Sequence, residues 1–227
     1  MKTVIRVFLF VAIVVLAYMC YQSILTPIEF DKTKETREKE IVSRLIDIRK
    51  AELEFKDQKG GFTPSFDTLI SFLKNSKKKT VLKEGSLSDK QLESGLTEAS
   101  AVKIVRSGNM QEIIANGLQN FRRDTAYVSV LQALYGDQYT AENIDSIAII
   151  PYSKGERFDL KVNNTYFNSS QILVPLFEAS AEYKTYLFDL NHQEMLNAID
   201  LRKKLEKFPG LKVGSVDEPN NFAGNWE

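Results

Sequence analysis

The chain has 227 residues, enough for one sizeable domain or two small ones. Apolar residues make up 43% and charged residues 26%, which is typical of a globular chain rather than a disordered one. Basic and acidic residues number 30 each, so the net charge of 0 excludes a global basic field for nucleic acid. One Cys and one His exclude multi-Cys or multi-His metal sites and a disulfide within the chain.

An apolar run near the N-terminus is the first feature along the chain. Residues Val7–Tyr21 contain no charged side chain, and the run extends upstream across Arg6. A helix of roughly 20 such residues can cross a bilayer, with the arginine reaching the interface. A cleaved signal peptide is the alternative, but neither residues 17–19 nor 21–23 place small side chains at both positions that signal peptidase reads. We therefore predict an uncleaved anchor and its leader over residues 1–26.

The residues beside this run indicate an orientation. The short leader carries Lys2 and Arg6, and basic residues at the end of a span favour the cytoplasmic side. Cys20 lies at the edge of the span, so the rest of the chain is free of cysteine, which suits an oxidising compartment. We predict a single-pass protein of the inner (cytoplasmic) membrane, in contact with the lipid bilayer and with its C-terminal part in the periplasm.

A long amphipathic helix follows the anchor. Residues 34–58 contain no Gly or Pro, and Glu alternates with Lys and Arg on the polar face. An apolar stripe at a spacing of three to four residues predicts a face that packs on the head of the molecule or on a partner helix. Four residues of this stripe are our candidate interaction residues: Ile41, Leu45, Ile48 and Phe55. We predict a stalk over residues 27–60, broken or kinked near Pro27 and ended by Gly60-Gly61.

The remainder, residues 61–227, predicts a mixed head. A short helix is expected from about Phe66 to Leu73, and the basic stretch 74–83 is expected to form a solvated turn or hairpin. Further short helices, a helix from Asn191 to about Lys207, and several strands follow. The expected strands are residues 125–131, 144–152, 157–167, 171–177, 182–188 and 211–216. The fold class is α+β: an N-terminal transmembrane helix, a long amphipathic helix, and a head with an antiparallel sheet and a C-terminal helix.

The junction between helix and head resembles that of type IV pilins and pseudopilins. There the N-terminal helix ends in an Ala-aromatic pattern, followed by a Gly-containing turn, an aromatic residue, a Pro and a short helix with a Leu. The corresponding residues here are Ala51, Phe55, Gly60, Phe62, Pro64 and Leu69. The resemblance implies a hydrophobic helix that feeds an antiparallel sheet, and a role in an envelope assembly.

Two features of the prepilin pattern are missing, and a second resemblance covers more of the chain. No Gly precedes the apolar run and the run contains no Glu, so we predict no processing by a prepilin peptidase. The whole chain also resembles uncharacterised single-span envelope proteins of Bacteroidota, notably at residues 121–128 and 209–215. That resemblance implies no particular activity.

Residues that could carry chemistry are few. His192, the only imidazole, follows a predicted helix cap, which favours a surface role over a Ser–His–Asp device. Ser-x-x-Lys occurs at Ser71 and Ser100, but the Lys-Thr-Gly partner motif is absent. No nucleotide-binding loop and no zinc-protease motif occurs. We predict no catalytic residue, no cofactor-binding or metal-binding residue, and no enzyme activity.

Arg122, Arg123 and Asp124 form the densest polar cluster beside apolar neighbours. Two adjacent guanidinium groups could clamp an anion or a carboxylate. The alternative, which we favour, is an internal ion pair at the start of a strand. Both arginines are candidate interaction residues.

These expectations lead to two hypotheses. The first is a non-enzymatic, membrane-anchored component of a bacterial cell-envelope assembly, in a pseudopilin-like or scaffold role. Its partners would be other envelope proteins, including further copies of the chain, with no nucleic acid and no small-molecule cofactor. The alternative is a membrane-anchored enzyme or small-ligand receptor with a pocket between the sheet and the C-terminal helix. A closed apolar cleft with converging polar groups would favour the alternative.

Overall fold

The computed structural model describes Lys2–Glu227, with side chains for all of these except residues 2–4, 80–83 and 124–125. The chain forms two compact units. We call residues 1–72 and 142–227 the head unit, and residues 73–141 the insert. The stretch 61–227, which the sequence suggests as one head, is therefore divided between the two units.

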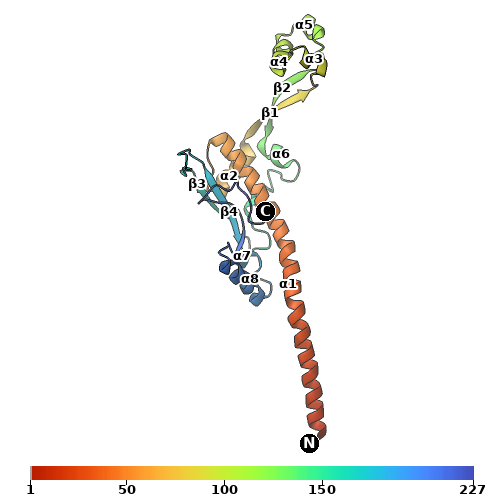
Figure 1. Cartoon of the computed structure of the whole chain (residues 1–227), viewed down its shortest axis with the longest axis vertical. Helices are drawn as coiled ribbons and strands as arrows, with labels where there is room; N and C mark the ends of the chain where they lie inside the picture. Colours follow the sequence, from red (N-terminus) through yellow and green to blue (C-terminus); the bar gives the residue numbers. More distant parts are fainter. Residues whose placement is uncertain (1) are drawn as a thin grey trace. The chain divides into compact units, whose positions relative to one another are not determined.

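The head unit begins with α1 (Lys2–Lys59), one uninterrupted helix (Figure 1). The break predicted near Pro27 is wrong, since this residue lies inside the helix. Proline removes one backbone hydrogen bond, but long helical segments on both sides hold the backbone in place across that gap. The residues predicted as anchor and as stalk consequently belong to the same helix.

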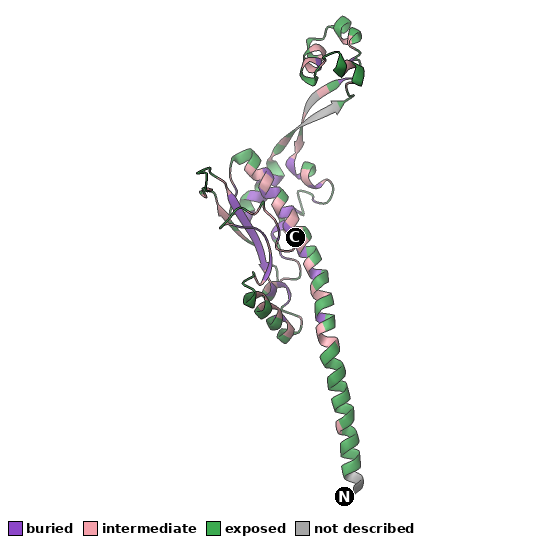
Figure 2. Cartoon of the chain, viewed as in Figure 1, coloured by how far each residue is buried: buried purple, intermediate pink, exposed green. Residues whose placement is uncertain are grey.

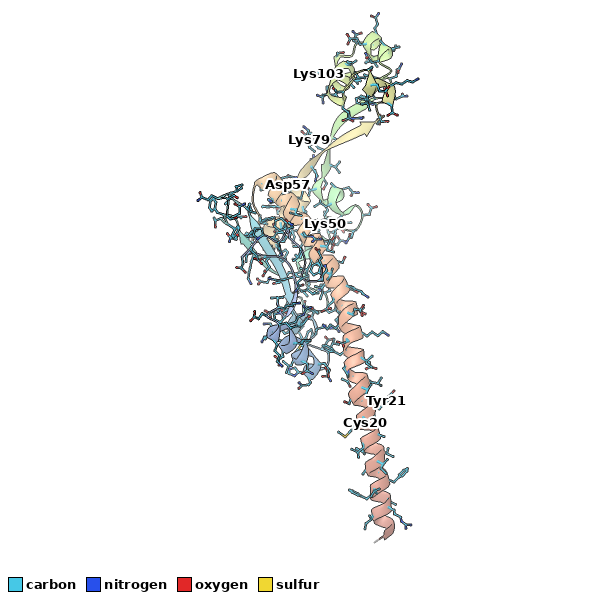
Figure 3. The ribbon with its side chains drawn as sticks, in the orientation of Figure 1. Cys20, Tyr21, Lys50, Asp57, Lys79 and Lys103 are labelled. Atoms are coloured by element: carbon cyan, nitrogen blue, oxygen red, sulfur yellow. The ribbon has the colours of Figure 1, made fainter. Side chains whose placement is uncertain are left out.

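The two halves of α1 differ in exposure, as the green and purple colouring of Figure 2 shows. The first half exposes its large apolar side chains; Phe8 and Phe10, for example, are 75% and 67% exposed. Cys20 and Tyr21 project from the same half (Figure 3). This part of the helix is long and apolar enough to cross a membrane. The second half buries a stripe of apolar residues at helical spacing.

A three-stranded antiparallel sheet covers that stripe. Its strands are β3 (Asp159–Asn163), β4 (Leu176–Glu182) and β5 (Gly210–Gly214), in the order β3-β4-β5. The central strand β4 is buried over all but its last residue, and both β4 and β5 contact α1. The head unit also contains α7 (Tyr183–Tyr186) and α8 (His192–Lys204), and α2 (Phe66–Asn75) begins in it.

Several strand predictions need correction. Residues 144–152 contain η1 (Ile144–Ala148), a 3-10 helix, and residues 182–188 contain α7. Both segments are short and apolar, and a short apolar run that is buried looks the same in a strand and in a helical turn. β4 begins near the end of predicted strand 171–177 and ends at the start of predicted strand 182–188. The sequence therefore placed this strand wrongly. Predicted strands 157–167 and 211–216 contain β3 and most of β5.

The insert is a hairpin with a small helical tip. β1 (Lys77–Glu84) and β2 (Arg122–Ser129) pair antiparallel, so the basic stretch forms a hairpin strand. The tip contains α3 (Asp89–Glu93), α4 (Glu98–Ser107) and α5 (Met110–Ala115), and α6 (Val130–Tyr135) follows β2. Ala101, Leu118 and Phe121 form the core of the tip.

Local signals explain the tip helices. The Thr97 side chain accepts a hydrogen bond from the Ser100 backbone, and the Ser100 side chain accepts one in return from the Thr97 N–H. This capping arrangement satisfies amides that would otherwise lack partners at the start of α4. Gly85 ends β1 with φ of 70°, and a Cβ there would lie 2.4 Å from the Asn120 carbonyl oxygen. The hairpin can therefore turn into the tip only with glycine at this position.

We expect Leu45→Ala to destabilise the head unit by about 2–5 kcal/mol, because this side chain is fully buried and its removal leaves a cavity. Phe55→Ala should cost less, since Phe55 is only half-buried. Thermal unfolding of the full-length protein in detergent, followed by near-ultraviolet circular dichroism, measures both.

Leu92→Ala is the matched control, since Leu92 lies in the insert and is 53% exposed. If Leu45→Ala melts at the same temperature as this control, the stripe does not pack on the sheet in solution.

Candidate functional site

The candidate residues of α1 lie inside the head unit. Ile41, Leu45 and Ile48 are fully buried, on the side of α1 that contacts the sheet and η1. Phe55, predicted to be buried with them, keeps part of its ring exposed and packs edge-on against Phe72, with ring centroids 5.0 Å apart. The stripe is therefore used within the chain, and in this structure these three aliphatic residues have no surface left for a partner helix.

An ion pair joins α1 to the loop after α7. The Arg37 guanidinium donates to both carboxylate oxygens of Asp189, at 2.6 and 2.7 Å, and its Nη1 also donates to the Tyr186 carbonyl oxygen at 2.6 Å. Arg37 is buried, and it lies over the Tyr152 ring, 4.8 Å from its centroid. Its hydrogen bonds to Asp189 hold the pKa of that carboxyl below its ordinary value. We call Arg37, Tyr152, Tyr186 and Asp189 the latch.

A neighbouring contact supports the latch. The Tyr152 hydroxyl donates to Glu40 Oε1 at 2.6 Å, so one ring binds a carboxylate of α1 through its edge and faces a guanidinium of α1. The hydrogen bond to this carboxylate raises the pKa of Tyr152. A planar, two-pronged arginine contact with an aromatic ring on its face fixes orientation as well as distance.

A buried carboxyl group lies further along α1. Glu52 is fully buried, and its Oε2 accepts a hydrogen bond from the Thr63 backbone N–H at 3.2 Å. Its Oε1 has no hydrogen-bond partner within the part of the chain that the structure describes. Burial, partly offset by the Thr63 hydrogen bond, raises the pKa of Glu52 from 4.5 to about 8. The carboxyl group is therefore neutral at pH 7 in the folded protein.

The C-terminal segment is attached to the same part of α1. Arg49 Nη1 donates to the Phe222 carbonyl oxygen at 3.0 Å and to Glu227 Oε1 at 2.8 Å. The Phe222 ring stacks on Phe177 of β4 and meets Phe62 edge-on, with centroids 5.2 and 5.3 Å apart. This aromatic cluster covers the junction where α1 ends and the chain turns into the head.

In the insert, Arg123 has a structural role. It donates to the carbonyl oxygens of Glu84, Gly85 and Arg122 and forms an ion pair with Glu98 at 3.0 Å. Its guanidinium also lies 4.1 Å from the centroid of the Phe121 ring. These contacts tie the end of the hairpin to α4. The side chain of Asp124, the acidic member of the predicted cluster, lies outside the described residues. Arg122 is exposed.

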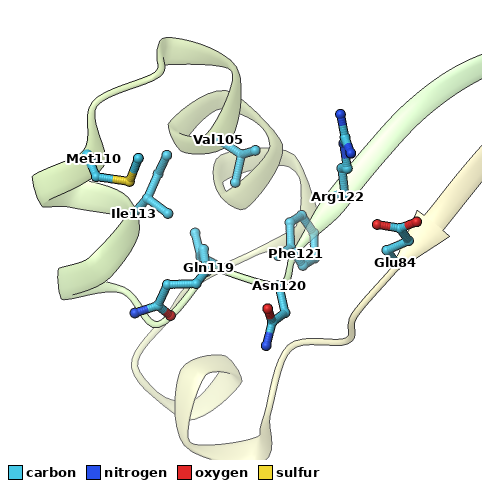
Figure 4. A pocket seen from close by; sticks show the side chains of 9 residues that line it. Glu84, Val105, Met110, Ile113, Gln119, Asn120, Phe121 and Arg122 are labelled. Atoms are coloured by element: carbon cyan, nitrogen blue, oxygen red, sulfur yellow. The ribbon is translucent and has the colours of Figure 1, made fainter.

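A cavity of about 570 Å³ opens beside this arginine pair (Figure 4). Its apolar lining comes from the tip helices and from the segment before β2 (Figure 4). Two charged side chains, Glu84 and Arg122, lie where β1 ends and β2 begins. The lining residues are Glu84, Val105, Met110, Ile113, Leu118, Gln119, Asn120, Phe121 and Arg122. This cavity lies entirely within the insert. The alternative hypothesis placed a pocket between the sheet and the C-terminal helix instead.

The other chemical candidates are surface residues. His192 is exposed at the start of α8, where the neighbouring Asn191 side chain accepts a hydrogen bond from the Glu194 N–H. Ser71 and Ser100 lie on α2 and α4, in the first turn of α4 for Ser100. Within the described residues, no group of three or more His, Cys, Asp or Glu side chains could hold a metal ion. Comparison with known proteins found no match to this chain among family models, curated proteins or solved structures.

Sequence reasoning missed the latch and Glu52. Arg37 and Asp189 are 152 residues apart, so no local signal pairs them. Glu52 lies on the same helix as the predicted stripe and, in the alternating Glu and Lys pattern, looks like a solvated residue.

We expect Arg37→Met to lower the free energy of unfolding by about 2 kcal/mol or more, because the Tyr186 carbonyl and the Asp189 carboxylate lose a charged donor. Arg37→Lys should recover only part of this loss, since an ammonium group cannot donate to both carboxylate oxygens in parallel. Thermal unfolding of the full-length protein measures the difference. Lys39→Met is the control, because it removes an exposed charge two residues further along α1. Equal melting of Arg37→Met and Lys39→Met would contradict a stabilising latch.

Glu52→Gln should change how stability depends on pH. The folded pKa of about 8 exceeds the ordinary 4.5, so the folded state binds the proton more tightly than the unfolded state. The stabilisation that this proton supplies is complete below about pH 4.5 and is lost as the pH rises towards 8. We therefore expect the free energy of unfolding of the variant to rise by several kcal/mol relative to that of the parent between pH 5 and pH 8, by the linkage between pKa and stability.

Urea unfolding across this range provides the test. Glu54→Gln, on the same helix, is the control, and a constant difference between Glu52→Gln and the parent at all pH values would refute an uncharged buried Glu52.

Proposed function

We propose that the protein is a non-enzymatic, membrane-anchored component of a bacterial cell-envelope assembly, in a scaffold or pseudopilin-like role. In this proposal the first half of α1 spans the inner membrane once, with its N-terminus in the cytoplasm and the rest of the chain in the periplasm. Its partners are other envelope proteins, further copies of the chain included.

One observation supports this proposal above the others. A single helix exposes its apolar first half and buries its second half in the head unit. A head carried in this way has little freedom to move relative to its anchor, because the latch and the Arg49 contacts hold the helix at separate points. Such rigidity is useful for presenting a surface at a fixed position above a membrane, and it serves no evident catalytic purpose.

The insert offers a surface for a partner. Met110 and Ile114 are 65% and 56% exposed on α5, next to the apolar cavity of the tip. Large exposed apolar side chains that gather beside a hollow are typical of protein-interaction sites. Lys103 projects from α4 of the same tip (Figure 3).

The cavity of the tip also favours a second candidate, a small-ligand receptor. A volume of about 570 Å³ falls within the range of ligand pockets, and its apolar wall is flanked by Glu84 and Arg122. No nucleophile paired with a base lines this cavity. We therefore propose this candidate as a binding protein.

Topology and mass measurements test the first proposal. We expect the chain to stay in the membrane after alkaline extraction and its periplasmic part to be degraded when protease is added to spheroplasts. Its intact mass should correspond to a chain that begins at Met1 or Lys2. Protection of the head, or a mature form that begins inside the apolar run, would contradict the proposal.

Native mass spectrometry of the chain released from gently solubilised membranes then separates the two candidates. An assembly component should carry stoichiometric protein partners, whereas a receptor should carry a small molecule. Met110→Asp, which places a charge on the rim of the cavity, should remove the partner in the first case. Leu92→Asp provides a control because it adds the same charge at an exposed site of the same unit.

A further inference from the structure

The C-terminal end of α8 and the C-cap residue that follows it carry exposed leucines beside basic side chains. Leu201 and Leu205 are 60% and 56% exposed. They are four residues apart, so they lie on one side of the helix, one above the other. Residues 201–207 contain four basic residues and one acidic residue. Lys203 and Lys204 are exposed between the two leucines.

This arrangement is not required by the helix itself. Basic side chains in the last turn of a helix stabilise its negative end, which would account for the lysines alone. It does not account for two leucines that remain in water when Met195 of α8 is buried in the head unit. Apolar and basic side chains together on an exposed helix are typical of contact with a membrane surface.

The position of α8 in the head unit brings it close to the anchor. Figure 1 shows α8 at the end of the head unit nearest to the apolar half of α1. Arg202 of α8 donates to the Tyr183 hydroxyl at 3.1 Å, and Lys34 of α1 lies over the Tyr183 ring, 5.2 Å from its centroid. The C-terminal half of α8 is therefore connected through one side chain to a known level of α1.

The rise of α1 gives the depth at which the packed part of the head unit begins. An apolar segment from Ile5 to Ile24 is about 30 Å long at 1.5 Å per residue, which matches the hydrocarbon core of a bilayer. Phe30 is only 5% exposed and lies six residues, about 9 Å, beyond this segment. The headgroup layer is roughly 5–8 Å thick on each side. The packed part of the head unit thus begins where the headgroups end.

We propose that α8 rests on the periplasmic surface of the bilayer. Leu201 and Leu205 enter the interface, and Lys203 and Lys204 pair with the phosphates of anionic phospholipids. This inference rests on the proposed membrane anchor. The charge of the segment favours anionic lipid over an uncharged surface, and the adjacent span brings lipid within reach without any further binding step.

Spin labels on single cysteines of the full-length protein test this contact. The native Cys20 reports whether α1 is in the membrane. Cys20→Ser combined with Leu201→Cys or Leu205→Cys reports on α8, and Leu196→Cys is the matched control. Leu196 is also exposed but is five residues from Leu201, about 140° around the helix. Each variant is reconstituted in nanodiscs that contain phosphatidylglycerol, and its accessibility to oxygen and to a water-soluble nickel complex is measured.

We expect the oxygen-to-nickel accessibility ratio at positions 201 and 205 to exceed that at 196 several-fold. Exchanging phosphatidylglycerol for phosphatidylcholine, or introducing Lys203→Gln with Lys204→Gln, should lower the ratio. If labels at 201 and 205 are as accessible to nickel as the label at 196 while Cys20 is in lipid, the inference fails and the anchor stands. If Cys20 is itself accessible to nickel, the proposed anchor fails. Protection of 201 and 205 from both reagents with spin–spin broadening would assign this face to a second copy of the chain and overturn the inference.

Discussion

The head unit depends on one apolar stripe of α1. Ile41, Leu45 and Ile48 are fully buried, and the central strand β4 lies in the same core. A three-stranded sheet with one apolar face cannot fold without a cover for that face, and α1 supplies it. Between Ile5 and Ile24 the large apolar side chains of the same helix are exposed. One continuous helix therefore has two different environments, and the residue types on its surface differ accordingly between its two halves.

Polar contacts hold the stripe at both of its ends. Arg37 precedes it and binds Asp189 and the Tyr186 carbonyl, whereas Arg49 and Glu52 follow it and bind the C-terminal segment and Thr63. Hydrophobic packing alone is non-directional and would tolerate some sliding along the helix. Bidentate and backbone-directed hydrogen bonds have narrow geometry, so they fix the register of α1 against the sheet. The uncharged Glu52 shows that this precision has a cost, since one of its oxygens lacks a partner among the described residues.

The features that the sequence predicts well are those with a repeating pattern. The stripe at helical spacing and the turn at Gly60-Gly61 both lie within a few residues of the signals that specify them. The latch joins residues 152 positions apart, and the separation of the insert from the head unit depends on which segments pack together. Neither leaves a local signal. The segments around Ile144 and Tyr183 were predicted as strands because a short, buried apolar run has no period long enough to distinguish a strand from a helical turn.

The continuity of α1 through Pro27 links the proposed anchor to the orientation of the head. A flexible joint at this proline would let the head turn freely above a membrane, whereas an unbroken helix transmits the tilt of its first half to its second half. The latch then transmits that tilt to the loop after α7, and Arg202 and Tyr183 extend the connection to α8. Tilt alone leaves rotation about the axis of α1 undetermined. A second contact with the bilayer, away from this axis, would remove that last freedom, and the basic, leucine-bearing side of α8 lies on the part of the head unit where such a contact would act.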